Sequence, residues 1–305
     1  MQNQKKIINI TELLLASLIW GIAFVAQSEG VKHIGSFTFN ALRFILGGIV
    51  LLPIIAIFDK KPKSKDGCKS NKTLFLGGIL CGCVLCLSST LQQLGIALGA
   101  PVGKAGFLTA LYIVLVPVIG IFLGKKSSPI VWICVGAAVV GMYFLCIDPK
   151  QQQLSLLISI SEILLILCAV GFSVHILVID KYSPLVSGIK LSCIQFFVAG
   201  LISTVLCLVF ETPSLAGIWA AAMPILYAGI MSCGVAYTLQ IVGQKNFNPA
   251  IASLLLSLES VFSMLAGFIL LKQTLSAREI AGCAIMMAAI ILVQIPTKQK
   301  EDKQS

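Results

Sequence analysis

The residue best placed to do chemistry is a carboxyl group in the middle of an apolar stretch. Glu259 lies near the midpoint of residues 249–271, which otherwise have the composition of a membrane-spanning helix. An ionisable side chain at the bilayer centre costs at least about 2.5–3.5 kcal/mol, so it must face protein or a water-filled cavity. Removal from water favours the protonated form of a carboxyl group. Glu259 is therefore predicted to contact a substrate or exchange a proton; the alternative is a structural hydrogen bond to a neighbouring helix.

Further polar and aromatic residues inside apolar stretches are candidates for the same site. They are Trp20, Asn40, Arg43, Gln92, Tyr112 and Tyr237. Trp20 lies away from the membrane interface, where tryptophan is usually enriched, and it is predicted either to line a ligand site or to pack. A buried tyrosine hydroxyl needs a hydrogen-bond partner. Asn40 and Arg43 lie one helical turn apart, and Arg43 is expected to hold an anionic substrate group or to pair with a carboxylate.

Small and polar residues recur at helical spacing in several of these stretches. They include Gln27 and Gln92, near the ends of the stretches 8–28 and 73–97, and Ser232 and Gln240 in the stretch 219–243. Leu256 lies one helical turn before Glu259 in the stretch 249–271. Such stripes either line a cavity or allow helices to approach closely. His175 is a candidate proton relay without an evident partner.

Metal-dependent and nucleophilic enzymes are disfavoured by what the sequence lacks. The chain has eleven Cys and two His, and most Cys lie inside apolar stretches. Cys81, Cys83 and Cys86 point to different faces of a helix at about 100° per residue, so they cannot chelate one ion together. No phosphate-binding glycine loop, zinc-protease motif or serine-nucleophile elbow is present. We expect no metal, no cofactor and no enzymatic activity.

The elements that must position these residues follow from composition. Of 305 residues, 58% are hydrophobic and 11% are charged, whereas a soluble domain has about 25% charged residues. Lipid is the solvent that fits this surface, and about 20 apolar residues per helix cross it. Ten such helices are predicted, at 8–28, 36–57, 73–97, 102–123, 129–147, 156–179, 187–210, 219–243, 249–271 and 277–295.

The distribution of basic residues predicts the orientation of these helices. With the N-terminus inside, fifteen of the 22 Lys and Arg residues fall on the inner side and five on the outer side. Positive residues are retained in the cytoplasm, so both termini are expected there, in a multi-pass protein of the plasma membrane. The net charge of +10 therefore reflects topology and does not indicate a nucleic-acid partner.

Weak internal similarity predicts two repeats. The matches include Glu12-Leu13-Leu14-Leu15 with Glu162-Ile163-Leu164-Leu165, Gly21 with Gly171, and Pro101 with Pro249, at offsets of 148 to 150. Each repeat has five helices, an odd number, so the second must start on the opposite side of the membrane. We therefore expect an all-α integral membrane protein with two inverted five-helix repeats, residues 1–148 and 149–297, and a charged cytoplasmic tail, residues 298–305. Inverted repeats are typical of transporters with a site between the halves.

Five short motifs, in this order, resemble the EamA family of the drug/metabolite transporter superfamily. They are Trp20-Gly21, Asn40-Ala41-Leu42-Arg43-Phe44, Gln92-Gln93-Leu94-Gly95, the segment from Gly103 to Tyr112, and Ser257-Leu258-Glu259-Ser260-Val261-Phe262. The resemblance implies secondary transport of small metabolites, often efflux, with cavity walls from both halves. Many family members have Glu in a Leu-Gly-Glu sequence after the fourth and ninth helices. This chain has Leu123-Gly124-Lys125 and Leu271-Lys272 there, so no role of that Glu carries over.

The leading hypothesis is a carrier that exports small metabolites such as amino acids by alternating access. Its coupling is open between proton exchange at Glu259 and uncoupled facilitation. A carrier of nucleotide sugars or sugar phosphates is an alternative, as is a membrane sensor or accessory subunit. The expected partners are a small-molecule substrate and the lipid bilayer, without nucleic acid, in a monomer or homodimer.

Overall fold

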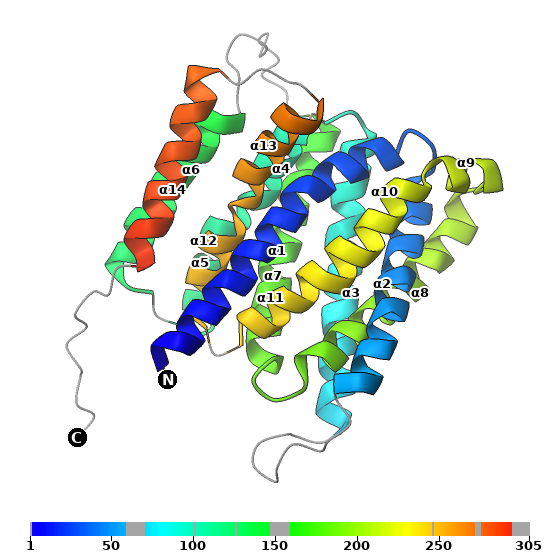
Figure 1. The fold of residues 1–305 in the computed structure, drawn as a ribbon, viewed down its shortest axis with the longest axis horizontal. Helices are drawn as coiled ribbons and strands as arrows, with labels where there is room; N and C mark the ends of the chain where they lie inside the picture. Colours follow the sequence, from blue (N-terminus) through cyan, green and yellow to red (C-terminus); the bar gives the residue numbers. More distant parts are fainter. Residues whose placement is uncertain are drawn as a thin grey trace.

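The computed structural model describes residues 2–58, 71–100, 102–125, 127–146, 159–245, 247–271 and 276–294. Over these ranges the ordered elements are helices, and no strand occurs among them. The helices stand roughly alongside one another as a bundle (Figure 1). The predicted tail, residues 298–305, and Lys272 lie outside the described residues.

Seven predicted spans are single helices. They are α1 (Gln2–Gly30), α2 (Ser36–Phe58), α3 (Asn71–Ala97), α6 (Pro129–Cys146), α7 (Ile160–Tyr182), α8 (Gly188–Phe210) and α14 (Ala277–Gln294). Three spans are each built from consecutive shorter pieces. The pieces are α4 (Val102–Ala110) and α5 (Tyr112–Phe122); α10 (Ala222–Leu226), η1 (Tyr227–Tyr237) and α11 (Thr238–Gly243); and α12 (Pro249–Leu256) and α13 (Glu259–Leu271).

These elements form the ten transmembrane helices that the sequence predicts. In the described part of the chain, eight spans are long and apolar enough to cross a membrane. The other two are the shorter apolar helix α6 and its partner α14, which lie side by side at one edge of the bundle (Figure 1). A short helix, α9 (Leu215–Ala220), leads into the eighth span.

The packing of the helices shows the inverted symmetry of the two halves. Helices α2 and α8, the second of each half, contact each other, and so do α6 and α14, the fifth of each half. The contact of α3 with α7 has its counterpart in the contact of η1 and α11 with α1. The contact of α1 with α13 has its counterpart in the contact of α7 with α4 and α5. The principal interfaces therefore join one half to the other, and exchanging the halves preserves them.

A glycine allows a close contact between two helices beside the candidate site. A Cβ atom added at Gly21 of α1 would lie 2.5 Å from the Cβ atom of Phe262 and 2.8 Å from its carbonyl carbon. The obstacle is backbone of α13, which a side-chain rotation cannot clear. Gly21 therefore allows α1 to lie directly against α13, next to Trp20 on one helix and Glu259 on the other.

The fourth and ninth spans, predicted as continuous helices, are both interrupted, and at equivalent positions of the two repeats. The first break separates Ala110 from Tyr112, and the second separates Leu256 from Glu259. In the second break, the hydroxyl of Ser257 donates to the carbonyl of Leu254 at 2.8 Å. A hydroxyl that bonds back to its own helix in this way competes with the backbone ladder and bends the helix. Each break places the first residue of its second piece inside the bundle.

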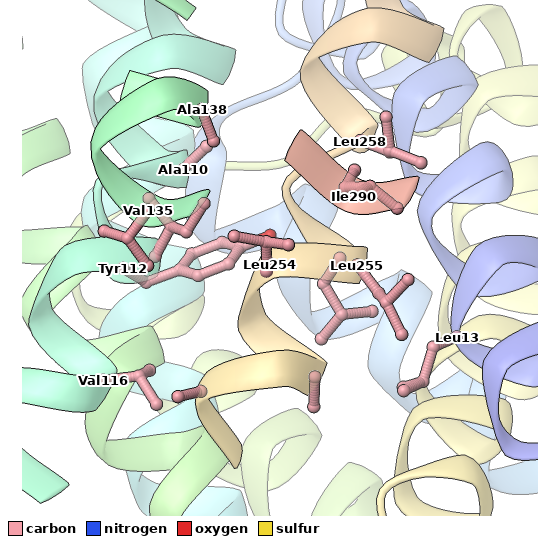
Figure 2. Packing of buried hydrophobic residues seen from close by; sticks show 14 of the residues in the cluster. Leu13, Ala110, Tyr112, Val116, Val135, Ala138, Leu254, Leu255, Leu258 and Ile290 are labelled. Atoms are coloured by element: carbon pink, nitrogen blue, oxygen red, sulfur yellow. The ribbon is translucent and has the colours of Figure 1, made fainter. Parts of the chain in front are cut away.

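A buried apolar cluster surrounds the two breaks. Side chains from α1, α5, α6, α12 and α14 converge there, including Leu13, Tyr112, Val135, Leu254 and Ile290 (Figure 2). The ring of Tyr112 packs among these side chains. This packing fixes the position of the ring, so that the hydroxyl is the part of Tyr112 that forms a polar contact.

Two polar contacts tie the halves together at opposite faces of the membrane. On the side where α1 begins and α14 ends, the Lys125 ammonium pairs with the Asp180 carboxylate at the end of α7. On the other side, Glu211 follows α8 and caps α2. Its carboxylate accepts hydrogen bonds from the backbone N–H groups of Phe37 and Thr38 at 2.9 and 2.8 Å, and from the Thr38 hydroxyl at 2.6 Å.

Candidate functional site

A cavity lies between the two halves, at the level of the helix breaks. The space open to a water-sized molecule is about 30 Å³, which holds roughly one or two waters. Its walls come from both halves and are mainly aromatic and polar side chains. The lining residues are Trp20, Phe24, Gln27, Arg43, Gln92, Thr109, Tyr112, Phe172, Ile176, Ser232, Tyr237, Gln240, Leu256 and Glu259.

The two helix breaks meet in this cavity through one hydrogen bond. The hydroxyl of Tyr112, at the start of α5, donates to Oε1 of Glu259, at the start of α13, at 2.9 Å. Both side chains are 4% exposed. A carboxyl group at this depth needs such a partner, because an unsatisfied polar group is costly in an apolar environment. The bond joins the repeats at equivalent points of their broken spans.

An aromatic pair forms a second wall of the cavity. The rings of Trp20 and Tyr237 lie 4.6 Å apart between centroids, in an edge-to-face arrangement at 60°. Tyr237 is the last residue of η1, an eleven-residue π-helix; π-helical turns are rare and are frequent at functional sites. The indole Nε1 of Trp20 is buried and has no hydrogen-bond partner among the described residues. It is therefore a free donor at the cavity wall.

Arg43 is a buried cation that forms no ion pair with a carboxylate among the described residues. It is 2% exposed, and its guanidinium carbon lies 5.6 Å from the ring centroid of Phe39 and 4.8 Å from that of Phe44. Its Nε and Nη2 atoms find no hydrogen-bond partner in the described part of the chain, and no carboxylate there forms an ion pair with it. The expected alternative of a structural pair with a carboxylate is thus not what the structure shows.

Amide side chains supply the remaining polar surface. Nε2 of Gln92 donates to the Thr109 hydroxyl at 3.3 Å. The Oε1 atoms of Gln27 and Gln240 are buried and have no partner among the described residues. The cavity therefore offers a ligand unused hydrogen-bonding atoms from α1 and from α11, one in each half.

The cavity brings together six of the seven residues proposed from the sequence. Asn40 is the exception: it is fully buried, and its Nδ2 donates to the Thr90 hydroxyl at 3.5 Å, away from the lining. Sequence reasoning missed four of the lining residues, Phe24, Thr109, Phe172 and Ile176. The position of Thr109, one helical turn before Tyr112, was a usable signal. The other three carry none, because phenylalanine and isoleucine are ordinary in a membrane helix.

His175 lies just outside the cavity. Its Nε2 pairs with Oε1 of Gln195 at 3.1 Å, and its ring meets that of Tyr237 edge-on at 6.0 Å. Over the described residues, no three His, Cys, Asp or Glu side chains are grouped so that they could hold a metal ion.

Comparison with known proteins gives a consistent picture. The EamA-like transporter family matches this chain twice, over residues 8–147 and 159–295. A protein of Archaeoglobus fulgidus described as an uncharacterized transporter is 28% identical over 289 residues, which cover 93% of this chain and 84% of that protein. A solved crystal structure aligns with a TM-score of 0.77 and 17% identity, over 94% of this chain and 96% of that one; at this identity the match shows the fold alone.

Proposed function

Because this chain belongs to the EamA-like transporter family, we propose that it is a secondary carrier that exports small metabolites such as amino acids by alternating access. The observation that supports this proposal is the cavity between the two halves, whose walls come from both inverted repeats. Carriers of this architecture bind their substrates at the repeat interface near the middle of the membrane, and rock one half against the other. The small free volume, about 30 Å³, fits a closed state in this cycle.

Proton exchange at Glu259 is the coupling that the site favours. Its carboxyl group lines the cavity and has the Tyr112 hydroxyl as its hydrogen-bond partner. An intramembrane carboxyl that faces a cavity can gain and lose a proton as each side opens to water. Glu259 would then bind the proton in one part of the cycle and the metabolite in the other, so that proton entry drives metabolite export.

A carrier of nucleotide sugars or sugar phosphates is less well supported. Such cargo brings two or more negative charges and needs several cations. Among the described residues, Arg43 is the one cationic side chain of the lining, and Glu259 adds a carboxyl group to the same space.

Transport by purified protein in liposomes tests the carrier proposal. We expect exchange of a radiolabelled amino acid across the membrane, and accumulation against its gradient when a pH gradient is imposed. Glu259→Gln should lose the pH-driven accumulation, because an amide cannot carry the proton, and any remaining exchange should need a higher substrate concentration. Glu29→Gln, at an exposed carboxylate that pairs with Lys32 outside the cavity, is the matched control. Absence of transport for a broad panel of amino acids, amines, sugars and sugar phosphates would refute the proposal.

We also propose that both termini lie in the cytoplasm, in the plasma membrane. The excess of Lys and Arg on the side of the termini supports this orientation. A fluorescent protein that folds only in the cytoplasm, fused after Ser305, should fluoresce, and the same fusion after Pro213 should not.

A further inference from the structure

The unpaired guanidinium of Arg43 requires an explanation that the fold does not supply. A buried ion loses several kcal/mol of hydration unless a partner compensates it. The rings of Phe39 and Phe44 return only part of that loss through cation–π contacts. Two of the three guanidinium nitrogens still lack a hydrogen-bond partner among the described residues. A charge held in the membrane interior, next to a cavity and without a protein partner, indicates a ligand that carries the opposite charge.

The same cavity holds one acidic group at a separate place. Arg43 and Glu259 both line it, yet no ion pair joins them. Tyr237 lines the same cavity as both groups. The unused Oε1 atoms of Gln27 and Gln240 add hydrogen-bonding positions to the lining. The cavity thus has a cationic donor and a carboxyl acceptor that do not neutralise each other directly.

We propose that the substrate is a zwitterion whose carboxylate binds the Arg43 guanidinium and whose ammonium group faces Glu259, an inference that rests on the proposed carrier function. A guanidinium binds a carboxylate through two parallel hydrogen bonds, and Nε and Nη2 are the two donors of one edge of that fork. The ammonium group donates to the carboxylate of Glu259, in competition with the Tyr112 hydroxyl. The substrate enters when the halves separate and widen the cavity.

The separation of the two poles selects against ligands with a single charge. A simple amine meets Glu259 favourably but brings its cation into a cavity that already contains Arg43. A simple carboxylic acid pairs with Arg43 but brings its anion toward Glu259. Like charges held together in a desolvated site cost several kcal/mol. A zwitterion satisfies both poles and leaves the cavity with no net charge.

The test compares each amino acid with two neutralised derivatives on the wild-type protein. The twenty proteinogenic amino acids are first assayed in proteoliposomes by counterflow. For each one transported, its methyl ester, which lacks the carboxylate, and its N-acetyl form, which lacks the ammonium group, are tested as competitors. We expect each derivative to compete at least about tenfold more weakly than the parent, because one charge-assisted contact is lost. Equal competition by either derivative would overturn the inference.

Two variants then assign the carboxylate to Arg43. Arg43→Met keeps much of the side-chain volume, and it should remove the preference for the amino acid over its methyl ester. Arg278→Met, at an arginine that lies against Tyr143 and Phe144 outside the cavity lining, should retain that preference. An unchanged preference in Arg43→Met would overturn the assignment. If Arg43→Met does not fold, the competition data on the wild-type protein still decide whether the site requires both charges of the substrate.

The outcomes separate this inference from the carrier proposal. Transport of amines or neutral solutes, with no amino acid transported, would refute the zwitterion site and leave the carrier function standing. Absence of transport for every solute tested would refute both.

Discussion

The hydrogen bond between Tyr112 and Glu259 makes a quantitative prediction about how the two helix breaks are coupled. Tyr112→Phe removes the hydroxyl and keeps the ring, which stays packed in the apolar cluster. Glu259→Met replaces the carboxyl group with an apolar side chain of similar length. The double variant removes both partners at once, so a double-mutant cycle isolates the energy of their contact.

The expected coupling energy follows from the geometry. A buried bond of 2.9 Å is well formed, and such a bond contributes about 1 kcal/mol between neutral groups or about 1.5–3 kcal/mol when one partner is charged. We therefore expect the losses in unfolding free energy of the two single variants to add up to about 1–3 kcal/mol more than the loss of the double variant. A value near the lower end indicates a protonated Glu259 in the closed state, and a value near the upper end indicates a carboxylate.

Equilibrium unfolding in mixed detergent micelles, followed by far-ultraviolet circular dichroism, measures the four free energies. The control cycle pairs Glu259→Met with Tyr143→Phe, because Tyr143 is an exposed residue of α6 outside the cavity lining, and it should be additive within about 0.5 kcal/mol. If the effects of the Tyr112 and Glu259 variants also add within about 0.5 kcal/mol, the contact between these two residues does not stabilise the protein. That result would refute the claim that the hydrogen bond couples the two helix breaks.

Two further variants test the packing of the halves by thermal unfolding in detergent. Gly21→Ala should lower the unfolding temperature and cost about 1–3 kcal/mol through overpacking against α13, whereas Gly136→Ala, where an added Cβ meets nothing within 4 Å, should be neutral or stabilising. Equal effects would contradict the close contact. Glu211→Ala removes the cap of α2 and should cost about 1–2 kcal/mol; Glu29→Ala, at an exposed ion pair, should cost under about 1 kcal/mol, and a larger loss there than at Glu211 would refute the cap.

Sequence reasoning recovered the spans because lipid imposes a simple rule on them. Each span is a run of apolar residues bounded by polar or charged ones, and each falls within a few residues of an observed helix or set of helix pieces. The breaks before Tyr112 and Glu259 were not predicted, because neither contains the glycine or proline that usually marks one. At the second break, the hydroxyls of Ser253 and Ser257 bond back to their own helix. The hydroxyls of Ser88 and Ser173 bond back in the same way within the unbroken helices α3 and α7, so a serine in the sequence does not by itself reveal a break.

The site was recoverable to the extent that its residues are unusual for a membrane. Glu259 and Arg43 stand out because charge inside the bilayer is costly. Asn40 stands out for the same reason but serves the contact with α3, through Thr90. Which polar residue faces the cavity depends on the rotation of each helix, and in the eighth span the π-helix η1 changes that rotation. The sequence period gives no sign of this wider turn.

The narrow cavity lies between halves that are joined by polar contacts at both ends of the bundle. Lys125 and Asp180 join the halves on the side where α1 begins and α14 ends, and Glu211 joins α8 to α2 on the other side. With both in place, the space beside Glu259 is about 30 Å³, well below the roughly 300–1,000 Å³ of a typical ligand pocket. Under the alternating access that we propose, each side would open by separating the halves on that side, so we expect the contact there to break while the contact on the other side stays intact.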